Sequence, residues 1–266
     1  TIKYDTAGTY SLEQELEKRY NLDRAIIVHV GQEVETKKKE QLMGKAVSDY
    51  ISQIVQDSMK IGFSWGRSLA ATVEKLEYQS TNDITCVPMI GGPAGALSSE
   101  YHVNTITYQA AKKLNGSALM IDSPAITGSP DIKNSLLNTP YNIKLTNLWK
   151  ELDMAIFGIG SPLIARKEVW KAFYGESIIA ELKENNVVGD ILSSFFDING
   201  KHVKLELHDR RIGIDFDTLK KIKVRIGVAE SKDKSLAILG ALRGNLLTSL
   251  ITTEETAKDI LFLDKS

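Results

Sequence analysis

The chain has 266 residues, of which 42% are hydrophobic and 25% are charged, a balance that is ordinary for a globular protein with a buried core. Its net charge of −1 argues against a surface that holds nucleic acid by bulk electrostatics. The single cysteine, Cys86, excludes an internal disulfide and a cysteine-cluster metal site. The sequence has no signal-peptide pattern, and no apolar run approaches the roughly 20 residues that span a bilayer. We therefore expect a cytoplasmic protein that has no membrane partner.

Helices and buried strands alternate along the first half of the chain. Ser11-Leu12-Glu13-Gln14 has the form of a capping box and predicts a helix to about Tyr20. Residues 24–30 are typical of a strand covered on both faces, and His29 near its end is interpreted as a core or strand-end residue rather than a ligand. The further expected elements are helices over 37–56, 67–76 and 98–114 and strands over 59–61, 84–89 and 118–121.

The second half continues this alternation and adds one insertion. Residues 190–196 and 201–203 flank Asn199-Gly200, a strong hairpin signal that predicts a small antiparallel insertion. Asp131 and Asp215 are expected to cap short helices. The other expected elements are strands over 154–157, 223–229 and 246–251, a helix over 235–242 and a closing helix that starts at the capping box 252–255. The pattern predicts one α/β domain over residues 1–266, with a mostly parallel, doubly wound sheet covered by helices on both faces.

The loop at residues 62–68 joins an expected strand to an expected helix. Glycine lets an anion approach the backbone, helix N–H groups and serine hydroxyls donate to it, and Arg67 adds a cation. Two interpretations remain open. Ser64 and Ser68 either cap the helix or help to form a phosphate cradle. The loop matches no Walker or dinucleotide fingerprint, so ATP and NAD are poor candidates.

Other polar residues follow the ends of neighbouring strands, where open α/β sheets bind their ligands. Gly91-Gly92 follows one strand, and His102 and Asn104 lie on the helix after it. Asp190 could accept sugar hydroxyls, although a turn aspartate that accepts backbone N–H groups is an equal alternative. Lys234 precedes a helix, where a bound anion or solvent exposure would explain a cation.

The sequence favours no catalytic or metal chemistry. The four histidines are scattered singly, and no pair has metal-ligand spacing. A Gly-x-Ser-x-Gly nucleophile elbow is missing, and Cys86 lies inside an apolar strand, where cysteine is usually inert. We therefore expect no catalytic residue, no metal and no cofactor.

Four motifs, taken in order and spacing, carry a resemblance to a known family. The chain resembles the C-terminal effector-binding domain of SorC-type bacterial transcriptional regulators over nearly its whole length. The matching segments are 62–69, 87–92, 188–190 with 196–200, and 234 through 241–244 to 252–254.

The resemblance implies a fold similar to sugar-phosphate isomerases and deaminases and an effector that is a phosphorylated sugar or a related metabolite. It implies an N-terminal helix-turn-helix that would bind DNA and that is absent from this chain, and assembly as a homodimer or homotetramer. By position, the implied ligand-binding residues are Ser64, Trp65, Gly66, Arg67, Ser68, Gly91, Gly92, His102, Asp190 and Lys234.

Two positions depart from the family pattern. Ile90 stands where some relatives have a lysine or arginine, so it cannot form a Schiff base or hold a second phosphate. Glu230-Ser231 replaces two glycines before Lys234. The leading hypothesis is a sensing domain for a sugar phosphate, possessing no enzymatic activity. The alternatives are an isomerase or deaminase on the same fold and an interaction domain with a vestigial pocket.

Overall fold

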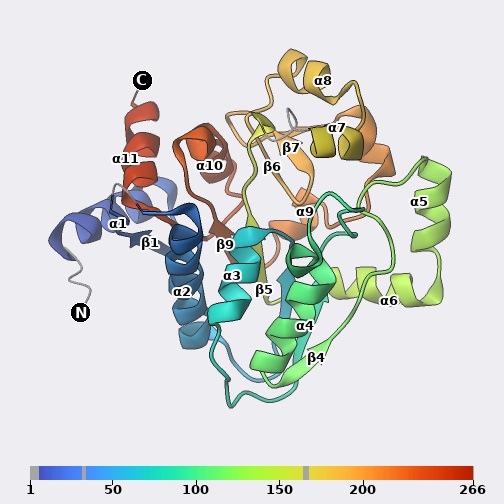
Figure 1. Ribbon diagram of the computed structural model, residues 1–266, viewed down its shortest axis with the longest axis horizontal. Helices are drawn as coiled ribbons and strands as arrows, with labels where there is room; N and C mark the ends of the chain where they lie inside the picture. Colours follow the sequence, from blue (N-terminus) through green and yellow to red (C-terminus); the bar gives the residue numbers. More distant parts are fainter. Residues whose placement is uncertain (1–5, 32–33, 164–167, 266) are drawn as a thin grey trace.

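A parallel sheet forms the centre of the molecule (Figure 1). The structure, a computed structural model, describes residues 6–31, 34–163 and 168–265. Within these residues the sheet has seven strands in the order β1-β10-β9-β5-β2-β3-β4, and every neighbouring pair is parallel. The strands are β1 (Arg24–Val28), β2 (Lys60–Phe63), β3 (Ile84–Pro88), β4 (Gly116–Ala118), β5 (Met154–Gly158), β9 (Val224–Val228) and β10 (Ser249–Thr253).

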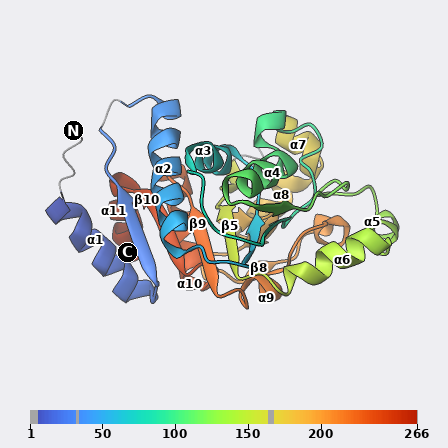
Figure 2. The ribbon, with the colours of Figure 1, turned by 90° about the horizontal axis from the view of Figure 1, so that it is seen from below.

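Helices cover both faces of this sheet, as the apolar strands predict (Figure 2). One face packs against α2 (Thr36–Ile54), α3 (Arg67–Lys75) and α4 (Val103–Lys113). The other face packs against α1 (Thr6–Tyr20), α6 (Pro140–Trp149), α9 (Phe216–Leu219), α10 (Ser235–Arg243) and α11 (Glu254–Leu263). The predicted fold class is confirmed. Among the described residues, no helix is both long and apolar enough to cross a membrane.

A smaller antiparallel sheet lies beside the main one, with two short helices near it (Figure 1). Its strands are β6 (Gly189–Ile191), β7 (Ser194–Phe196) and β8 (His202–Val203), and the helices are α7 (Glu168–Tyr174) and α8 (Ile178–Glu184). The insertion is confirmed, and it has a tight turn at Leu192-Ser193, with φ of 55° and 56°. The predicted hairpin around Asn199-Gly200 is confirmed as well, because the loop 197–201 joins the antiparallel strands β7 and β8, and the Asp197 carboxylate accepts the N–H groups of Asn199 and Lys201 in it.

Some predicted boundaries are wrong for identifiable reasons. Helix α1 begins at Thr6, before the capping box, and its Glu13 and Glu17 side chains accept the N–H groups of Ile27 and Ala25 on the sheet edge. Ser129, rather than Asp131, caps α5 (Pro130–Leu137). The predicted helix 98–114 is divided into the 3₁₀ turn η1 (Ser99–Tyr101) and α4, because His102 is extended between them.

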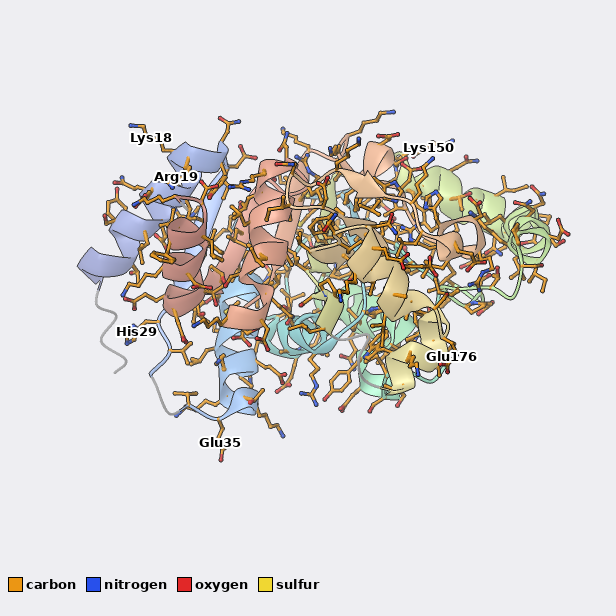
Figure 3. The ribbon with its side chains drawn as sticks, turned by 90° about the horizontal axis from the view of Figure 1, so that it is seen from above. Lys18, Arg19, His29, Glu35, Lys150 and Glu176 are labelled. Atoms are coloured by element: carbon orange, nitrogen blue, oxygen red, sulfur yellow. The ribbon has the colours of Figure 1, made fainter. Side chains whose placement is uncertain are left out.

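Other local predictions are confirmed. The Asp215 carboxylate caps α9 by accepting the Thr218 N–H at 2.7 Å. Thr253 caps α11 in the same way by accepting the N–H of Thr256. His29 is a strand-end residue, because it directly follows β1 and contacts Glu254 at 2.7 Å (Figure 3).

Candidate functional site

A cleft of about 500 Å³ lies at the carboxyl ends of the parallel strands. Its lining comes from the loops after β2, β3, β5 and β9 and from η1, α2, α7 and the small sheet. Its lining residues are Glu40, Met43, Ser64, Trp65, Gly66, Arg67, Ser68, Leu69, Ala96, Leu97, Ser98, Tyr101, Gly158, Ile159, Gly160, Val169, Trp170, Tyr174, Asp190, Leu192, Val228, Glu230 and Lys234.

The loop before α3 has its glycine where the backbone conformation requires one. Gly66 has φ 115° and ψ 170°, a backbone conformation that residues other than glycine rarely adopt. Its N–H donates to the Tyr101 carbonyl at 3.1 Å, and the Ser64 hydroxyl donates to the Trp65 carbonyl at 3.2 Å. Among the described residues, no side chain caps α3. The capping interpretation of the loop is therefore wrong, and the N–H groups of the first residues of α3, which line the cleft, have no hydrogen-bond partner among the described residues.

Arg67 lies at the cleft rim with its charge already balanced. Its guanidinium contacts the Glu40 carboxylate of α2 at 3.4 Å and lies over the Tyr101 ring at 5.7 Å. The side chain keeps 61% of its surface exposed, so the ion pair contributes little to stability. Arg67 can therefore exchange Glu40 for another anion at low cost.

Asp190 reaches the cleft from the middle of β6. Its backbone N–H donates to the Gly160 carbonyl, and its carbonyl accepts the Gly160 N–H. Its carboxylate accepts the Ser193 N–H at 3.2 Å. Burial raises its pKa to about 6, although the Ser193 N–H and the charges of Lys234 and Arg211 oppose this rise. A side chain at position 160 would meet the carboxylate and would have to displace it.

Lys234 ends the 3₁₀ turn η4 (Lys232–Lys234) and faces the same cleft. Burial lowers its pKa, and the carboxylates of Glu230, Asp190 and Glu40 oppose that shift. Glu230 itself contacts Lys39 of α2 at 3.2 Å. The cleft thus holds charges of both signs rather than a uniform cationic surface.

Aromatic rings form one wall of the cleft. Trp65 lies 6.5 Å from Trp170 and 5.9 Å from Phe173 between ring centroids. Trp170 stacks on Tyr174 at 5.8 Å. The Tyr174 hydroxyl is 3.2 Å from the Ser193 hydroxyl, in the turn that positions Asp190. Rings of this kind can pack on the C–H face of a sugar, while the polar wall binds its hydroxyl groups.

The described residues contain no cluster of three or more histidine, cysteine or acidic side chains that could hold a metal ion. Cys86 is fully buried in β3, and burial raises the pKa of its thiol, which makes it a poor nucleophile.

Comparison with known proteins decides the family. The model of the Sugar-bind family, described as a sugar-binding domain, matches residues 4–262. The sorbitol operon regulator of Klebsiella pneumoniae is 37% identical over 98% of this chain and 82% of its own length. The full-length crystal structure of that regulator, SorC, superposes with a TM-score of 0.93 over 98% of this chain and 83% of its own, at 35% identity. A transcriptional regulator from Streptococcus pneumoniae superposes with a TM-score of 0.92, covering 99% of this chain and 100% of its own, at 30% identity.

The chain belongs to this family. It is a SorC-type sugar-binding domain of the kind found in transcriptional regulators of sugar metabolism, and its matched relatives are named as regulators rather than enzymes.

The structure of this SorC-type domain brings most of the predicted site residues together. The cleft lining contains Ser64, Trp65, Gly66, Arg67, Ser68, Asp190 and Lys234.

Three predicted residues lie outside the described lining of the cleft. Gly91 packs against the backbone of Pro124 and Ala125, and Gly92 packs against the His102 ring. His102 caps α4 by accepting the Asn104 N–H at 3.1 Å, and burial lowers its pKa. Ligand binding by Gly91, Gly92 and His102 stays a prediction, since each has a packing role here.

Several residues of the SorC-type cleft were not predicted from the sequence. Glu40, Tyr101, Trp170 and Tyr174 come from helices or helix ends that carry no motif. Only Gly160 had a usable signal, because it lies in a third glycine loop that follows a strand.

Proposed function

We propose that this domain senses a phosphorylated sugar in the cleft at the carboxyl ends of the strands. The observation that carries the proposal is the shared location of three features. The uncapped start of α3, the half-buried Asp190 and Lys234 all face one cleft. Its volume, about 500 Å³, lies within the range that small-molecule sites occupy.

The loop 64–68 is the proposed phosphate site. Open N–H groups at a helix start, the helix dipole and the serine hydroxyls all favour an anion there. Arg67 would exchange the Glu40 carboxylate for the phosphate. Ile90 is fully buried in the core and cannot offer a second cation, which supports a single phosphate.

Asp190 and Lys234 are the proposed partners of the sugar hydroxyls. A carboxylate accepts hydrogen bonds and an ammonium group donates them, so the pair can bind both functions of a polyol. The rings of Trp65 and Trp170 would cover the C–H groups of the sugar. Burial strengthens each of these hydrogen bonds, because water competes less for the donors and acceptors.

Binding affinity tests this assignment. Hexose and hexitol monophosphates are compared with their unphosphorylated parents by calorimetry, and we expect the phosphate group to improve affinity about 100-fold. Lys234→Ala should weaken binding of the preferred ligand about tenfold or more, whereas Lys232→Ala, an exposed residue of the same turn outside the cleft lining, should not. Equal affinity for phosphorylated and unphosphorylated sugars would refute the phosphate site.

Effector binding would act on the intact regulator through oligomeric state and DNA affinity. A ligand shifts such an equilibrium only if it binds the two states differently. We propose a homodimer or homotetramer, acting in the cytoplasm and binding DNA through a separate N-terminal domain. Light scattering of the domain with and without the preferred ligand measures the first step. An unchanged mass, together with unchanged DNA affinity of the full regulator, would contradict it.

One observation favours a second function, isomerase- or deaminase-type chemistry on a sugar phosphate. Asp190, with a pKa near 6, lies beside a lysine whose pKa is lowered, as acid and base pairs do in enzymes. Turnover of a sugar phosphate that disappears in Asp190→Asn would favour this alternative over sensing.

A further inference from the structure

A second cavity, of about 350 Å³, lies away from the effector cleft, between α5, α6, α9 and the 3₁₀ turn η3 (Glu206–Arg210). It shares no lining residue with the effector cleft. Lys150, at its rim, lies on the opposite side of the molecule from Glu35, the residue that precedes α2 (Figure 3). Its lining residues are Lys133, Leu137, Thr146, Trp149, Lys150, His208, Arg211, Gly213, Ile214, Asp215 and Thr218.

This lining is cationic. Lys133, Lys150 and Arg211 face Asp215, the one carboxylate among the described lining residues. Asp215 is exposed and already caps α9 through the Thr218 N–H. The cavity therefore gathers more positive charge than its own residues neutralise.

Arg211 is the buried centre of this charge, with 4% of its surface exposed. Its guanidinium donates to the carbonyls of Leu192 at 2.9 Å and Gly213 at 3.1 Å, and also to that of Ile214. All three acceptors are neutral, and among the described residues no carboxylate forms an ion pair with it. Burial lowers the pKa of the guanidinium to about 10 even though the charges of Asp215 and Asp190 favour its charged form, so a further anion in the cavity would stabilise its charge.

The pKa values of the neighbouring titratable groups reflect the same burial and the same excess of positive charge. Burial lowers the pKa of Lys133 and of His208, and the Arg211 charge lowers both further. The His202 ring lies 4.8 Å from the His208 ring. Each group would hold its proton more strongly if an anion entered the cavity.

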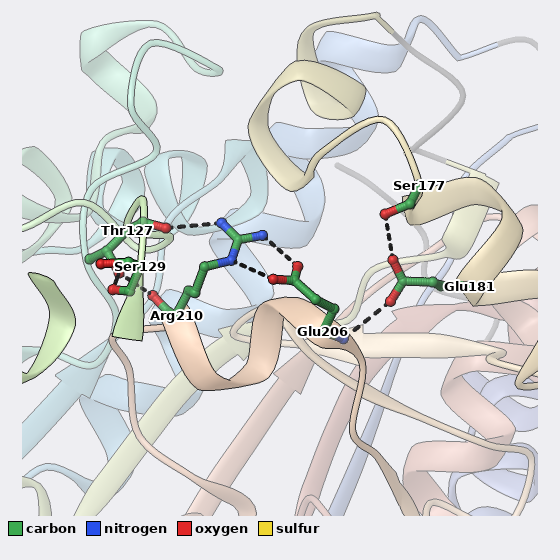
Figure 4. A network of polar contacts seen from close by, with 6 residues as sticks. All are labelled: Thr127, Ser129, Ser177, Glu181, Glu206 and Arg210. Carbon is green, nitrogen blue, oxygen red and sulfur yellow. Dashed lines mark hydrogen bonds and ion pairs between the residues drawn. The ribbon is translucent and has the colours of Figure 1, made fainter. Parts of the chain in front are cut away.

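A hydrogen-bond network holds η3 in place (Figure 4). Arg210 donates to the Thr127 carbonyl at 2.9 Å and to the Glu206 carboxylate at 2.7 and 3.1 Å. The Glu206 N–H in turn donates to the Glu181 carboxylate of α8 at 3.1 Å. The backbone around His208 and Arg211 is therefore held by hydrogen bonds to Thr127 and to Glu181 of α8.

We propose that this second cavity binds the phosphate group of a small metabolite, held by Lys133, His208 and Arg211 with Lys150 at the rim. A doubly charged phosphate matches several cations better than a carboxylate, which one arginine can satisfy. The apolar side chains of Leu137, Trp149 and Ile214 would contact the carbon part of the ligand. This site has its own lining residues, although Arg211 also donates to the carbonyl of Leu192 in the effector cleft, and the proposal does not depend on the function proposed for that cleft.

The three tryptophans allow both sites to be followed in one experiment. Trp149 lines the second cavity, whereas Trp65 and Trp170 line the effector cleft. The protein is labelled with 5-fluorotryptophan, the three fluorine NMR signals are assigned with single Trp→Phe variants, and inorganic phosphate is the titrant.

We expect the Trp149 signal to shift along a saturable curve. Lys133→Ala should raise its dissociation constant about tenfold, the equivalent of one charge-assisted hydrogen bond. Lys150→Ala, at an exposed position, should raise it less. Lys144→Ala is the matched control, because Lys144 is exposed on α6, which ends just before Lys150, but does not line the cavity. Ser68→Ala should weaken the Trp65 response and leave the Trp149 curve unchanged.

Three outcomes would overturn the proposal. The Trp149 signal could stay fixed while the Trp65 signal responds, which would limit phosphate to the effector cleft. The Trp149 curve could be the same in Lys133→Ala and Lys150→Ala as in the parent protein. Succinate could shift Trp149 with higher affinity than phosphate, which would assign the cavity to carboxylates.

Discussion

The loops after β2 and β3 follow neighbouring strands, and Gly66 of the first loop has a different role from Gly91 and Gly92 of the second. In the first loop, Gly66 has φ 115° and an added side chain would meet no atom within 4 Å. In the second loop, Gly91 and Gly92 have ordinary φ values but lie against other parts of the chain. Gly66 shapes the backbone, as Gly95 with φ 81° does further along the second loop, whereas Gly91 and Gly92 make room for close packing.

The hydrogen bonds of the two loops differ in the same way. In the second loop the N–H of Gly91 donates to Ile212 and that of Gly92 donates to Ser123, at 3.0 and 2.8 Å. In the first loop the N–H groups of Ser64 and Gly66 also donate to carbonyls, at 3.1 Å each, but the helix that follows starts without a side-chain cap. A loop whose donors are satisfied internally stabilises the fold, and a loop with donors left open can bind a ligand.

Gly91→Ala should cause the largest effect, and the effect should be on stability. The new methyl group would collide with the backbone of Pro124 and Ala125, which cannot move as a flexible side chain could. We expect the free energy of unfolding to fall by about 3 kcal/mol or more, measured by urea denaturation. Gly128→Ala is the control, because the atom nearest to its new methyl group would be the flexible Ile132 Cδ1 at 3.5 Å. A loss below about 1 kcal/mol would contradict close packing at Gly91.

The pH dependence of stability in Asp190→Asn tests the difference between the two loops, because the first loop faces the Asp190 carboxylate and the second loop does not. The pKa of Asp190 is about 6 in the folded protein against 3.8 for the free side chain. Between these values the folded protein holds a proton that the unfolded chain has released, so Asp190 destabilises the fold increasingly as the pH rises through this window.

The stability of Asp190→Asn minus that of the parent protein should therefore increase from pH 4 to pH 7 by up to about 3 kcal/mol. Urea denaturation at both pH values measures it, and Asp131→Asn, an exposed carboxyl of α5, controls for general charge effects. A difference that stays constant with pH would show that Asp190 keeps an ordinary pKa.

The sequence predicted the fold well because apolar runs locate buried strands wherever the chain is covered on both faces. The misplaced strand ends have a local cause. Leu246 and Leu247 are buried just before β10, so the apolar run begins earlier than the hydrogen-bonded strand. The chain also has two candidate turns in the small sheet, and Leu192-Ser193 lacks the glycine that marks most such turns.

The site was predictable only in part. Gly66 and Gly91 look alike in the sequence, because a glycine after a strand does not say whether another segment will pack against it. Whether a segment packs against Gly91 depends on residues 123–125 and 212–213, which are distant from it in the sequence. Glu40 and Trp170 reach the cleft from helices with no motif, so only the tertiary arrangement places them there.

Gly66→Ala should affect both stability and binding. Alanine rarely adopts φ 115° and ψ 170°, and the strain should cost about 1–3 kcal/mol of unfolding free energy. The loop would relieve this strain by changing shape, so we expect the affinity for the preferred sugar phosphate to fall as well. Calorimetry and urea denaturation measure the two effects. If the variant loses stability but keeps its full affinity, the loop 64–68 does not hold the phosphate.

His102→Ala should give the smallest effect, and it distinguishes a packing residue from a ligand. The Nδ1 atom of His102 accepts the Asn104 N–H at 3.1 Å, so its loss should cost about 1 kcal/mol, as loss of a helix cap does. His102→Asn, which can still cap α4, should recover most of this stability. The affinity for the sugar phosphate should be unchanged in both variants, because the ring packs on Gly92 outside the described cleft lining. If instead both variants lose affinity while His102→Asn keeps its stability, His102 contacts the ligand and the Gly91-Gly92 turn that packs on it belongs to the binding site.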